Sequence, residues 1–306
     1  MKKGWYRPYL RSWQLYLLLI PTIAYFVIFR YIPILGVQIS VKDYMPALGI
    51  WGSHWAEPFF KHFTRFFNSY YAERLIVNTL VLSFGQLILG FPMPVILALL
   101  LNEVKNRKIK KVAQTITYAP HFISTVVLVG LLTSLLNTSN GLVNYLLMKA
   151  NLIQEPIAFL TDPGWFKPLY IISGIWQEMG WGAVVYMAAL AGVDQQLYEA
   201  AKVDGAGRLK RIWYITIPAI MPTMVTMLIL NCGKVMNIGY EKVYLMQNDL
   251  NISSSDVIST YVYKVGILDN QYSFSTAVNL FNSVINTLLL IVVNKISKKV
   301  GDTSLW

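Results

Sequence analysis

Six long stretches of this 306-residue sequence carry almost no charge, and they restrict the chain to few folds. Each stretch has between 18 and 37 residues, and Glu178 is the one charged residue inside them. A helix that crosses the hydrocarbon core of a bilayer needs about 20 mostly apolar residues. The pattern predicts an all-α membrane protein with six transmembrane helices. They are expected near residues 13–33, 75–101, 112–135, 168–191, 213–234 and 273–294.

The composition argues against an ordinary soluble enzyme. Hydrophobic residues make up 55% of the chain and charged residues 13%, whereas soluble domains carry about 25% charged residues. The single cysteine, Cys232, has no partner in the chain, which excludes a scaffold built on disulfides. We therefore interpret residues 1–306 as one transmembrane domain.

The third uncharged stretch, from Lys111 to Lys149, is long enough to suggest two helices, since it has 37 residues. Residues 137–141 read Asn-Thr-Ser-Asn-Gly, which is a cluster of turn-forming residues. We expect this cluster to end one spanning helix rather than to join two.

The basic residues lie mostly on one side of the predicted spans. The N-terminus, the loop after the second span, the loop after the fourth span and the C-terminal tail hold 16 of the 26 Lys and Arg residues and five of the 15 acidic residues. Cytoplasmic loops of membrane proteins carry an excess of Lys and Arg. Both termini are therefore expected in the cytoplasm. Because this excess accounts for the whole net charge of +11, we expect no nucleic-acid partner.

One cytoplasmic loop, residues 194–218, contains a predicted short amphipathic helix. Asp194 is a suitable N-cap, and Gly205 and Gly207 are expected to end the helix because glycine tolerates positive φ. Ala200 and Ala201 would let the helix enter a narrow groove on another protein. Glu199 and Asp204 would offer anionic groups to a basic partner. A solvated loop helix without a partner is the alternative interpretation.

The same loop resembles the EAA loop of ABC-importer permeases. The matching residues are Glu199-Ala200-Ala201, then Gly205, Ile215 and Ile217-Pro218, with Ile217 where the family usually has leucine. More widely, the chain resembles the LplB-type polysaccharide permeases of the binding-protein-dependent sugar-uptake group. The segments that carry this resemblance are Gly174–Trp181, Asp256–Tyr263 and a tail ending in Trp306.

This resemblance implies a MetI-like, type I importer domain in the bacterial cytoplasmic membrane, crossing it several times and forming half of a sugar pathway by alternating access. The EAA helix would couple the pathway to an ATPase. The implied ATPase contacts are Glu199, Ala200, Ala201, Asp204, Gly205, Ile215 and Pro218. The implied partners are a second homologous permease in a heterodimer, a cytoplasmic ABC ATPase dimer, an extracellular substrate-binding lipoprotein, a carbohydrate substrate and membrane lipid.

No cofactor is expected in the chain itself. The sequence contains no GxxxxGK[ST] segment, which is the loop that cradles nucleotide phosphates. ATP and Mg²⁺ are therefore expected in the partner ATPase. No metal site is expected either, because His54 and His62 are eight residues apart with no nearby acidic or cysteine pair at ligand spacing.

Polar residues inside two predicted spans are the candidate sugar contacts. A carboxylate inside a span costs at least ~2.5 kcal/mol, so it usually faces a cavity or a partner. The candidates are Gly174, Gln177, Glu178 and Trp181 on the fourth span and Asn231 and Lys234 on the fifth. Rings pack on the C–H faces of sugars, while polar groups bind their hydroxyls. The alternative is that Glu178 and Lys234 form a buried pair that joins two spans and that Trp181 only packs.

An intramembrane enzyme and a carrier are the two alternative functions. An intramembrane enzyme is disfavoured because the sequence has no HExxH, no GxSxG and no second carboxylate in a span. An ion-coupled or stand-alone carrier also fits six spans with one buried carboxylate.

The aromatic residues of the external segment 44–71 fit either a docking surface for a substrate-binding protein or a belt at the membrane interface.

Overall fold

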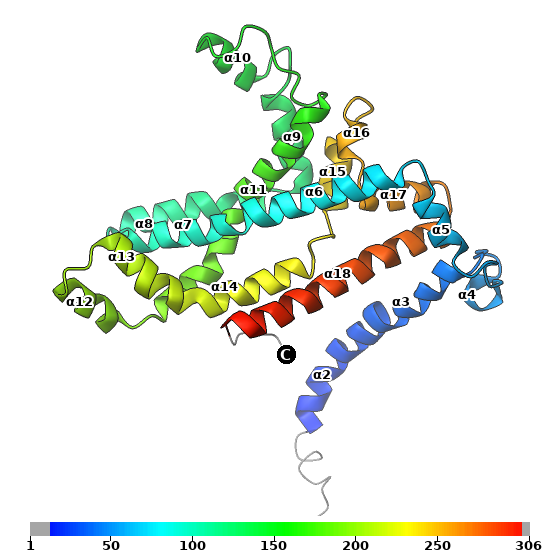
Figure 1. The fold of residues 1–306 in the computed structure, drawn as a ribbon, viewed down its shortest axis with the longest axis horizontal. Coiled ribbons are helices and arrows are strands. Elements are labelled where there is room, and N and C mark those ends of the chain that lie inside the picture. The colour runs from blue at the N-terminus through cyan, green and yellow to red at the C-terminus, as the bar shows by residue number, and fades with distance from the viewer. Residues whose placement is uncertain (1–12, 302–306) are drawn as a thin grey trace, which may run out of the picture. The chain divides into compact units, whose positions relative to one another are not determined.

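The computed structural model describes residues 13–301, and these are almost entirely helical (Figure 1). The basic N-terminal residues 1–12 and the tail residues 302–306, including Trp306, lie outside the described residues. The described chain forms two compact units. The first consists of residues 13–68 with 264–280, and the second of residues 69–263 with 281–301.

The first unit begins with a long apolar helix. The run consists of α2 (Trp13–Phe26), η1 (Val27–Tyr31), α3 (Ile32–Ile34) and η2 (Leu35–Val41). The short helices α4 (Gly49–Gly52) and α5 (Lys61–Phe67) follow, and η5 (Lys264–Leu268) and the first residues of α18 (Tyr272–Gly301) complete the unit. Buried Lys42 donates a hydrogen bond from Nζ to the Ile50 carbonyl oxygen at 2.7 Å and lies over the Trp55 ring.

The second unit holds the remaining helices. They are α6 (Ala72–Gly90), α7 (Pro92–Glu103), α8 (Arg107–Tyr118), η3 (Ala119–Phe122), α9 (Thr125–Leu135), α10 (Leu142–Lys149), α11 (Pro163–Ala191), α12 (Gln195–Val203), α13 (Arg208–Arg211), η4 (Ile212–Thr216), α14 (Ile217–Cys232), α15 (Tyr240–Met246), α16 (Ile252–Ser255), α17 (Ile258–Tyr263) and the rest of α18.

The helix α11 is the centre of the second unit and contacts α6, α7, α8 and α14. One apolar cluster joins α7, α11 and α14 through Val95, Ala98, Ala183, Tyr186, Leu190 and Ile220. A second cluster joins α6 and α11 to α15 and its flanking residues through Leu82, Phe166, Tyr170, Ile171, Ile238, Val243 and Val257. The first cluster fixes α11 against α7 and α14, and the second fixes it against α6 and α15. Side chains on the remaining face of α11 therefore have defined positions.

Four helical runs of the described chain are long and apolar enough to cross a membrane, compared with the six spans expected. They are Trp13–Val41, Ala72–Glu103, Arg208–Cys232 and Tyr272–Lys299. A fifth results if Arg107–Phe122 and Thr125–Leu135 count as one span. The expected fourth span corresponds to α11, which has 29 residues but is not among these apolar runs. Lys167, Gln177 and Glu178 make it more polar.

The expected third span, 112–135, is not one straight helix, because α8 and α9 are bent by 100° at a short break. Pro120 lies in the break, and a proline lacks a backbone N–H and clashes with the carbonyl four residues earlier. Ser124 then caps α9, since its Oγ accepts a hydrogen bond from the Val127 N–H. Figure 1 shows α8 beside α7 and α9 running in another direction.

Candidate functional site

A cavity of about 430 Å³ lies in the second unit, between α6, α11, α14 and the residues after α14. Its wall contains aromatic rings as well as groups that can donate or accept hydrogen bonds. The aromatic residues are Phe91, Tyr170, Trp181 and Tyr186, and the polar ones are Ser83, Gln86, Glu178, Asn231, Lys234 and Asn237. This mixture suits a ligand with both apolar faces and many hydroxyl groups.

Glu178 and Trp181 are three residues apart on α11 and both line the cavity. The Glu178 side chain is 55% exposed, so its carboxylate is accessible within the chain rather than sealed in the core. Glu178 Oε2 lies 3.0 Å from His121 Nδ1. Because an ionised carboxylate only accepts hydrogen bonds, Nδ1 carries the donated proton. The His121 ring is stacked on the Trp181 ring, with centroids 4.7 Å apart and an angle of 4°.

Asn231 and Lys234 line the same cavity from the end of α14. Glu178 and Lys234 therefore share one cavity, and the buried ion pair between them, which was the alternative interpretation, is not formed. His121 is the group that contacts the Glu178 carboxylate, and Lys234 makes no ion pair within the part of the chain that the structure describes. The physical reason is that the break between α8 and α9 brings a nearer basic group to the carboxylate.

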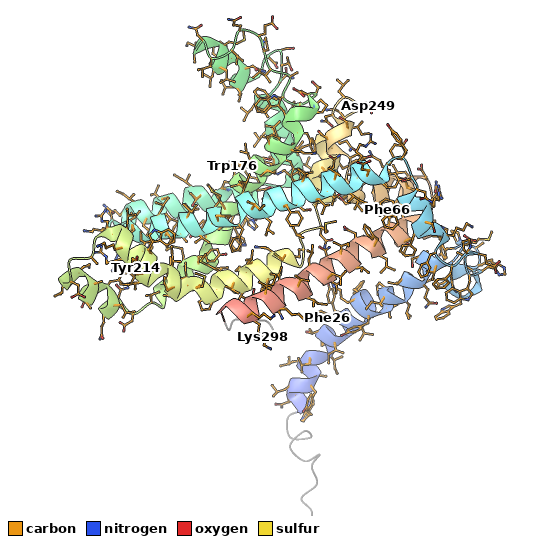
Figure 2. All side chains as sticks on the ribbon, viewed as in Figure 1. Phe26, Phe66, Trp176, Tyr214, Asp249 and Lys298 are labelled. Carbon is orange, nitrogen blue, oxygen red and sulfur yellow. The ribbon has the colours of Figure 1, made fainter. Side chains whose placement is uncertain are left out.

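Gly174 and Gln177 are not among the residues that line the cavity. Gln177 Nε2 donates to the Ile123 carbonyl oxygen at 2.9 Å, so it connects α11 to the break after α8. A methyl group at Gly174 would lie 3.0 Å from Gln86 Oε1 and 3.3 Å from Lys242 Nζ. Gly174 therefore makes room for polar side chains that support the cavity wall. Trp176, labelled in Figure 2, lines a separate apolar groove against α9.

Lys242 is a buried ammonium beneath this part of the wall. Its Nζ donates to the Tyr170 carbonyl oxygen at 2.9 Å and lies 4.6 Å from the centre of the Tyr170 ring. Burial lowers the pKa of Lys242 to about 8, while the negative charge of Glu178 raises it. The charges of Lys242 and Glu178 therefore lie close enough to interact.

The predicted helix of the cytoplasmic loop is α12, and Asp194 and Gly205 form its two ends as expected. The expectation for Gly207 is wrong, since it has φ of −66° and precedes α13 as its N-cap. Asp194 Oδ1 accepts a hydrogen bond from the Gln196 N–H at 2.9 Å. At the other end Gly205 has φ of +76°, and the Gly205 and Ala206 N–H groups donate to the carbonyl oxygens of Lys202 and Ala201. This is a Schellman motif, which requires a residue that tolerates positive φ at Gly205.

The chain after α12 is fastened back to it. The hydroxyl oxygens of Tyr198 and Thr216 are 3.0 Å apart, and Arg211 donates to the Ala206 carbonyl oxygen at 2.8 Å. Ile215 lies in the π-helical turn η4, and Pro218 occupies the first turn of α14. The loop is thus a folded unit attached to α14. Of its expected contact residues, Glu199, Ala200, Asp204, Gly205 and Pro218 are exposed, while Ala201 and Ile215 are half-buried.

Residues 90–302 match the family described as the inner membrane component of binding-protein-dependent transport systems. The chain belongs to this family. It therefore has the MetI-like permease fold, as the sequence indicated, and the family is a transport component rather than an ATPase.

Relatives of this permease include proteins named for the transport of sugar polymers. Protein LplB of Bacillus subtilis is 46% identical over 303 residues, covering 99% of this chain and 94% of that protein. The polygalacturonan/rhamnogalacturonan transport system permease YteP of the same organism is 44% identical over 292 residues, covering 95% and 90%. A chain in the crystal structure of a bacterial alginate ABC transporter superposes with a TM-score of 0.90 at 38% identity, covering 99% of this chain and 100% of that one. The protein is a permease subunit of a sugar ABC importer in the bacterial cytoplasmic membrane.

Sequence reasoning on this permease missed several residues of the cavity and its wall. His121, Ser83 and Gln86 are polar residues inside predicted spans, so the argument that identified Glu178 applied to them as well. They were missed because the candidates were chosen around the charged residues Glu178 and Lys234. Lys242 could not be found by this argument, because it lies in a polar segment outside the candidate spans. Only the folded chain brings its Nζ to the Tyr170 carbonyl oxygen in the cavity wall.

Proposed function

We propose that this permease forms half of the translocation pathway for an oligosaccharide and that its cavity contacts the sugar. The observation that carries the proposal is that Glu178 and Trp181 are presented together on one wall, with Asn231 and Lys234 on the α14 side. The Trp181 ring is 47% exposed and provides a flat apolar surface. The polar groups around it provide donors and acceptors for hydroxyl groups.

The proposed cargo is an oligosaccharide that carries acidic sugars. Support comes from the similarity to a chain of a transporter that imports the acidic polysaccharide alginate, at 40% identity and a TM-score of 0.88. Within the cavity, Lys234 is exposed and makes no ion pair among the described residues, whereas Glu178 already has a partner in His121. A carboxylate on the sugar would therefore meet an available ammonium group.

The proposed energy source is a cytoplasmic ABC ATPase dimer that binds ATP and Mg²⁺ and holds α12. A second homologous permease would complete the pathway, and an extracellular substrate-binding lipoprotein would deliver the sugar. Because α12 is fastened to the start of α14 through Tyr198 and Arg211, displacement of α12 would move α14, which lines the cavity. This gives alternating access a direct mechanical route.

The proposed topology keeps six membrane crossings with both termini in the cytoplasm. The four apolar runs, the broken α8–α9 pair and α11 together supply six segments. A polar α11 is compatible with crossing because Glu178 faces the cavity and Gln177 faces the α8–α9 break rather than lipid.

Two tryptophan substitutions on α11 test the sugar contact. In the complete transporter in proteoliposomes, we expect Trp181→Ala to raise the trigalacturonate concentration for half-maximal uptake roughly fivefold, because an aromatic contact contributes about 1 kcal/mol. Trp176→Ala is the matched control, since Trp176 lines the separate groove against α9. Equal effects of the two substitutions, measured per inserted transporter, would contradict the proposal.

A further inference from the structure

The break between α8 and α9 lies against the wall of the cavity that carries Glu178 and Trp181. Two contacts, one on each side of this break, connect it to α11. Gln177 Nε2 donates to the Ile123 carbonyl oxygen at 2.9 Å. At Gly180, the absence of a side chain lets the Thr117 carbonyl group approach α11 more closely than any Cβ atom would allow. The position of the intervening residues 118–122 relative to α11 is therefore fixed at both ends.

His121 is in the middle of this fixed segment and contacts both proposed sugar-binding side chains. Its Nδ1 lies 3.0 Å from Glu178 Oε2, and its ring is stacked on Trp181 with an angle of 4°. Phe122 meets the Trp181 ring edge-on, with centroids 5.8 Å apart. Trp181 is therefore covered by imidazole on one face and restrained by Phe122.

The contacts of His121 decide what Glu178 and Trp181 can offer to a sugar. Glu178 Oε2 already accepts a hydrogen bond from His121, so Oε1 is the carboxylate oxygen with both lone pairs left for a ligand. One face of Trp181 is covered, so a sugar can stack on the other face. His121 itself is not among the residues that line the cavity, so it would act through its two neighbours.

We infer that His121 is a positioning residue that fixes the Glu178 carboxylate and the Trp181 ring for sugar binding. The inference rests on the proposed sugar contact of the cavity. His121 has two separable roles: the Nδ1–H donates to Glu178 and orients it, and the imidazole plane sets the tilt of Trp181. Loss of the first role leaves a carboxylate without its donor facing an acidic sugar. Loss of the second lets the indole rotate.

Two substitutions separate these roles. His121→Phe keeps an aromatic plane against Trp181 but removes the donor to Glu178. His121→Asn keeps a donor near the position of Nδ1 but removes the ring. In the complete transporter, we expect His121→Phe to raise the trigalacturonate concentration for half-maximal uptake roughly tenfold, as for loss of a hydrogen bond to a charged group. We expect His121→Asn to raise it roughly fivefold, because an aromatic contact contributes about 1 kcal/mol. The maximal rate per inserted transporter should stay within about twofold, because a uniform binding interaction is what is lost.

Double substitutions test whether His121 acts through its neighbours. The effect of His121→Phe should disappear in a Glu178→Gln background, and the effect of His121→Asn should disappear in a Trp181→Ala background. Trp176→Ala, which changes a ring in the separate groove against α9, is again the control and should have no effect.

The results distinguish a wrong inference from a wrong proposed function. If the His121 effects persist unchanged in both backgrounds, or if neither single substitution has an effect while Trp181→Ala does, the positioning role is overturned. If Trp181→Ala and Glu178→Gln leave half-maximal uptake unchanged, the sugar contact itself is wrong and the inference fails with it. Should His121→Phe not insert, the His121→Asn arm decides.

Discussion

At the scale of single residues, Gly180 sets how closely two helices of the permease pack. A Cβ atom at this position would overlap the Thr117 carbonyl group of α8. Backbone atoms cannot rotate away as a side chain can, so any side chain at this position must push α8 and α11 apart. The separation would also disturb the contacts of the neighbouring Gln177, Glu178 and Trp181 with the break.

We therefore predict that Gly180→Ala destabilises the permease by about 1–3 kcal/mol, the usual cost of overpacking. The measurement is the thermal unfolding midpoint of the purified chain in detergent. Gly130→Ala in α9 is the matched control, because no atom lies within 4 Å of the Cβ position there. It should be neutral or raise the midpoint slightly, since alanine favours helix. Equal midpoints for both variants would show that α8 can yield at this contact.

At the scale of elements, α12 depends on the backbone conformation of Gly205. Its φ of +76° lets the Gly205 and Ala206 N–H groups close the Schellman motif. Proline at this position would fix φ near −65° and remove an N–H that donates to the Lys202 carbonyl oxygen. The chain would then leave α12 in another direction, away from Arg211 and η4.

We predict that Gly205→Pro abolishes most ATP-driven sugar uptake while the amount of inserted permease stays normal, since the loop lies outside the candidate spans until Arg208. Uptake and membrane content are measured in the same cells. Gly207→Ala is the control, because Gly207 has φ of −66° and nothing within 4 Å of its Cβ position. Normal uptake with Gly205→Pro would remove the coupling role of α12.

The same elements show which parts of the fold could be predicted from the sequence. The helix α12 was predictable because its cap and its stop are local signals, Asp194 and Gly205. The break at 119–124 was missed because the sequence around it is uncharged and Pro120 is its main local signal. The pairing of Glu178 with His121 joins residues 57 positions apart. It depends on that break, so the charge pattern alone suggested Lys234 instead.

At the scale of the whole molecule, the one-sided charge predicts which surfaces face the cytoplasm. Val203 at the end of α12 and Tyr70 before α6 are 88% and 89% exposed, so a cysteine at either site would be equally accessible to a reagent in solution. Only the side of the membrane should then decide labelling. The natural Cys232 is buried and can be replaced by serine to remove background.

In a Cys232→Ser background, we predict that Tyr70→Cys reacts with a membrane-impermeant maleimide on intact cells, whereas Val203→Cys reacts only after permeabilisation. Val203→Cys should also become protected when the partner ATPase is co-expressed, because α12 is its proposed contact, while Tyr70→Cys should not change. Labelling of Val203→Cys from outside would place α12 on the wrong side of the membrane for any cytoplasmic ATPase. Cytoplasmic labelling without protection would keep the topology but require another contact for the ATPase.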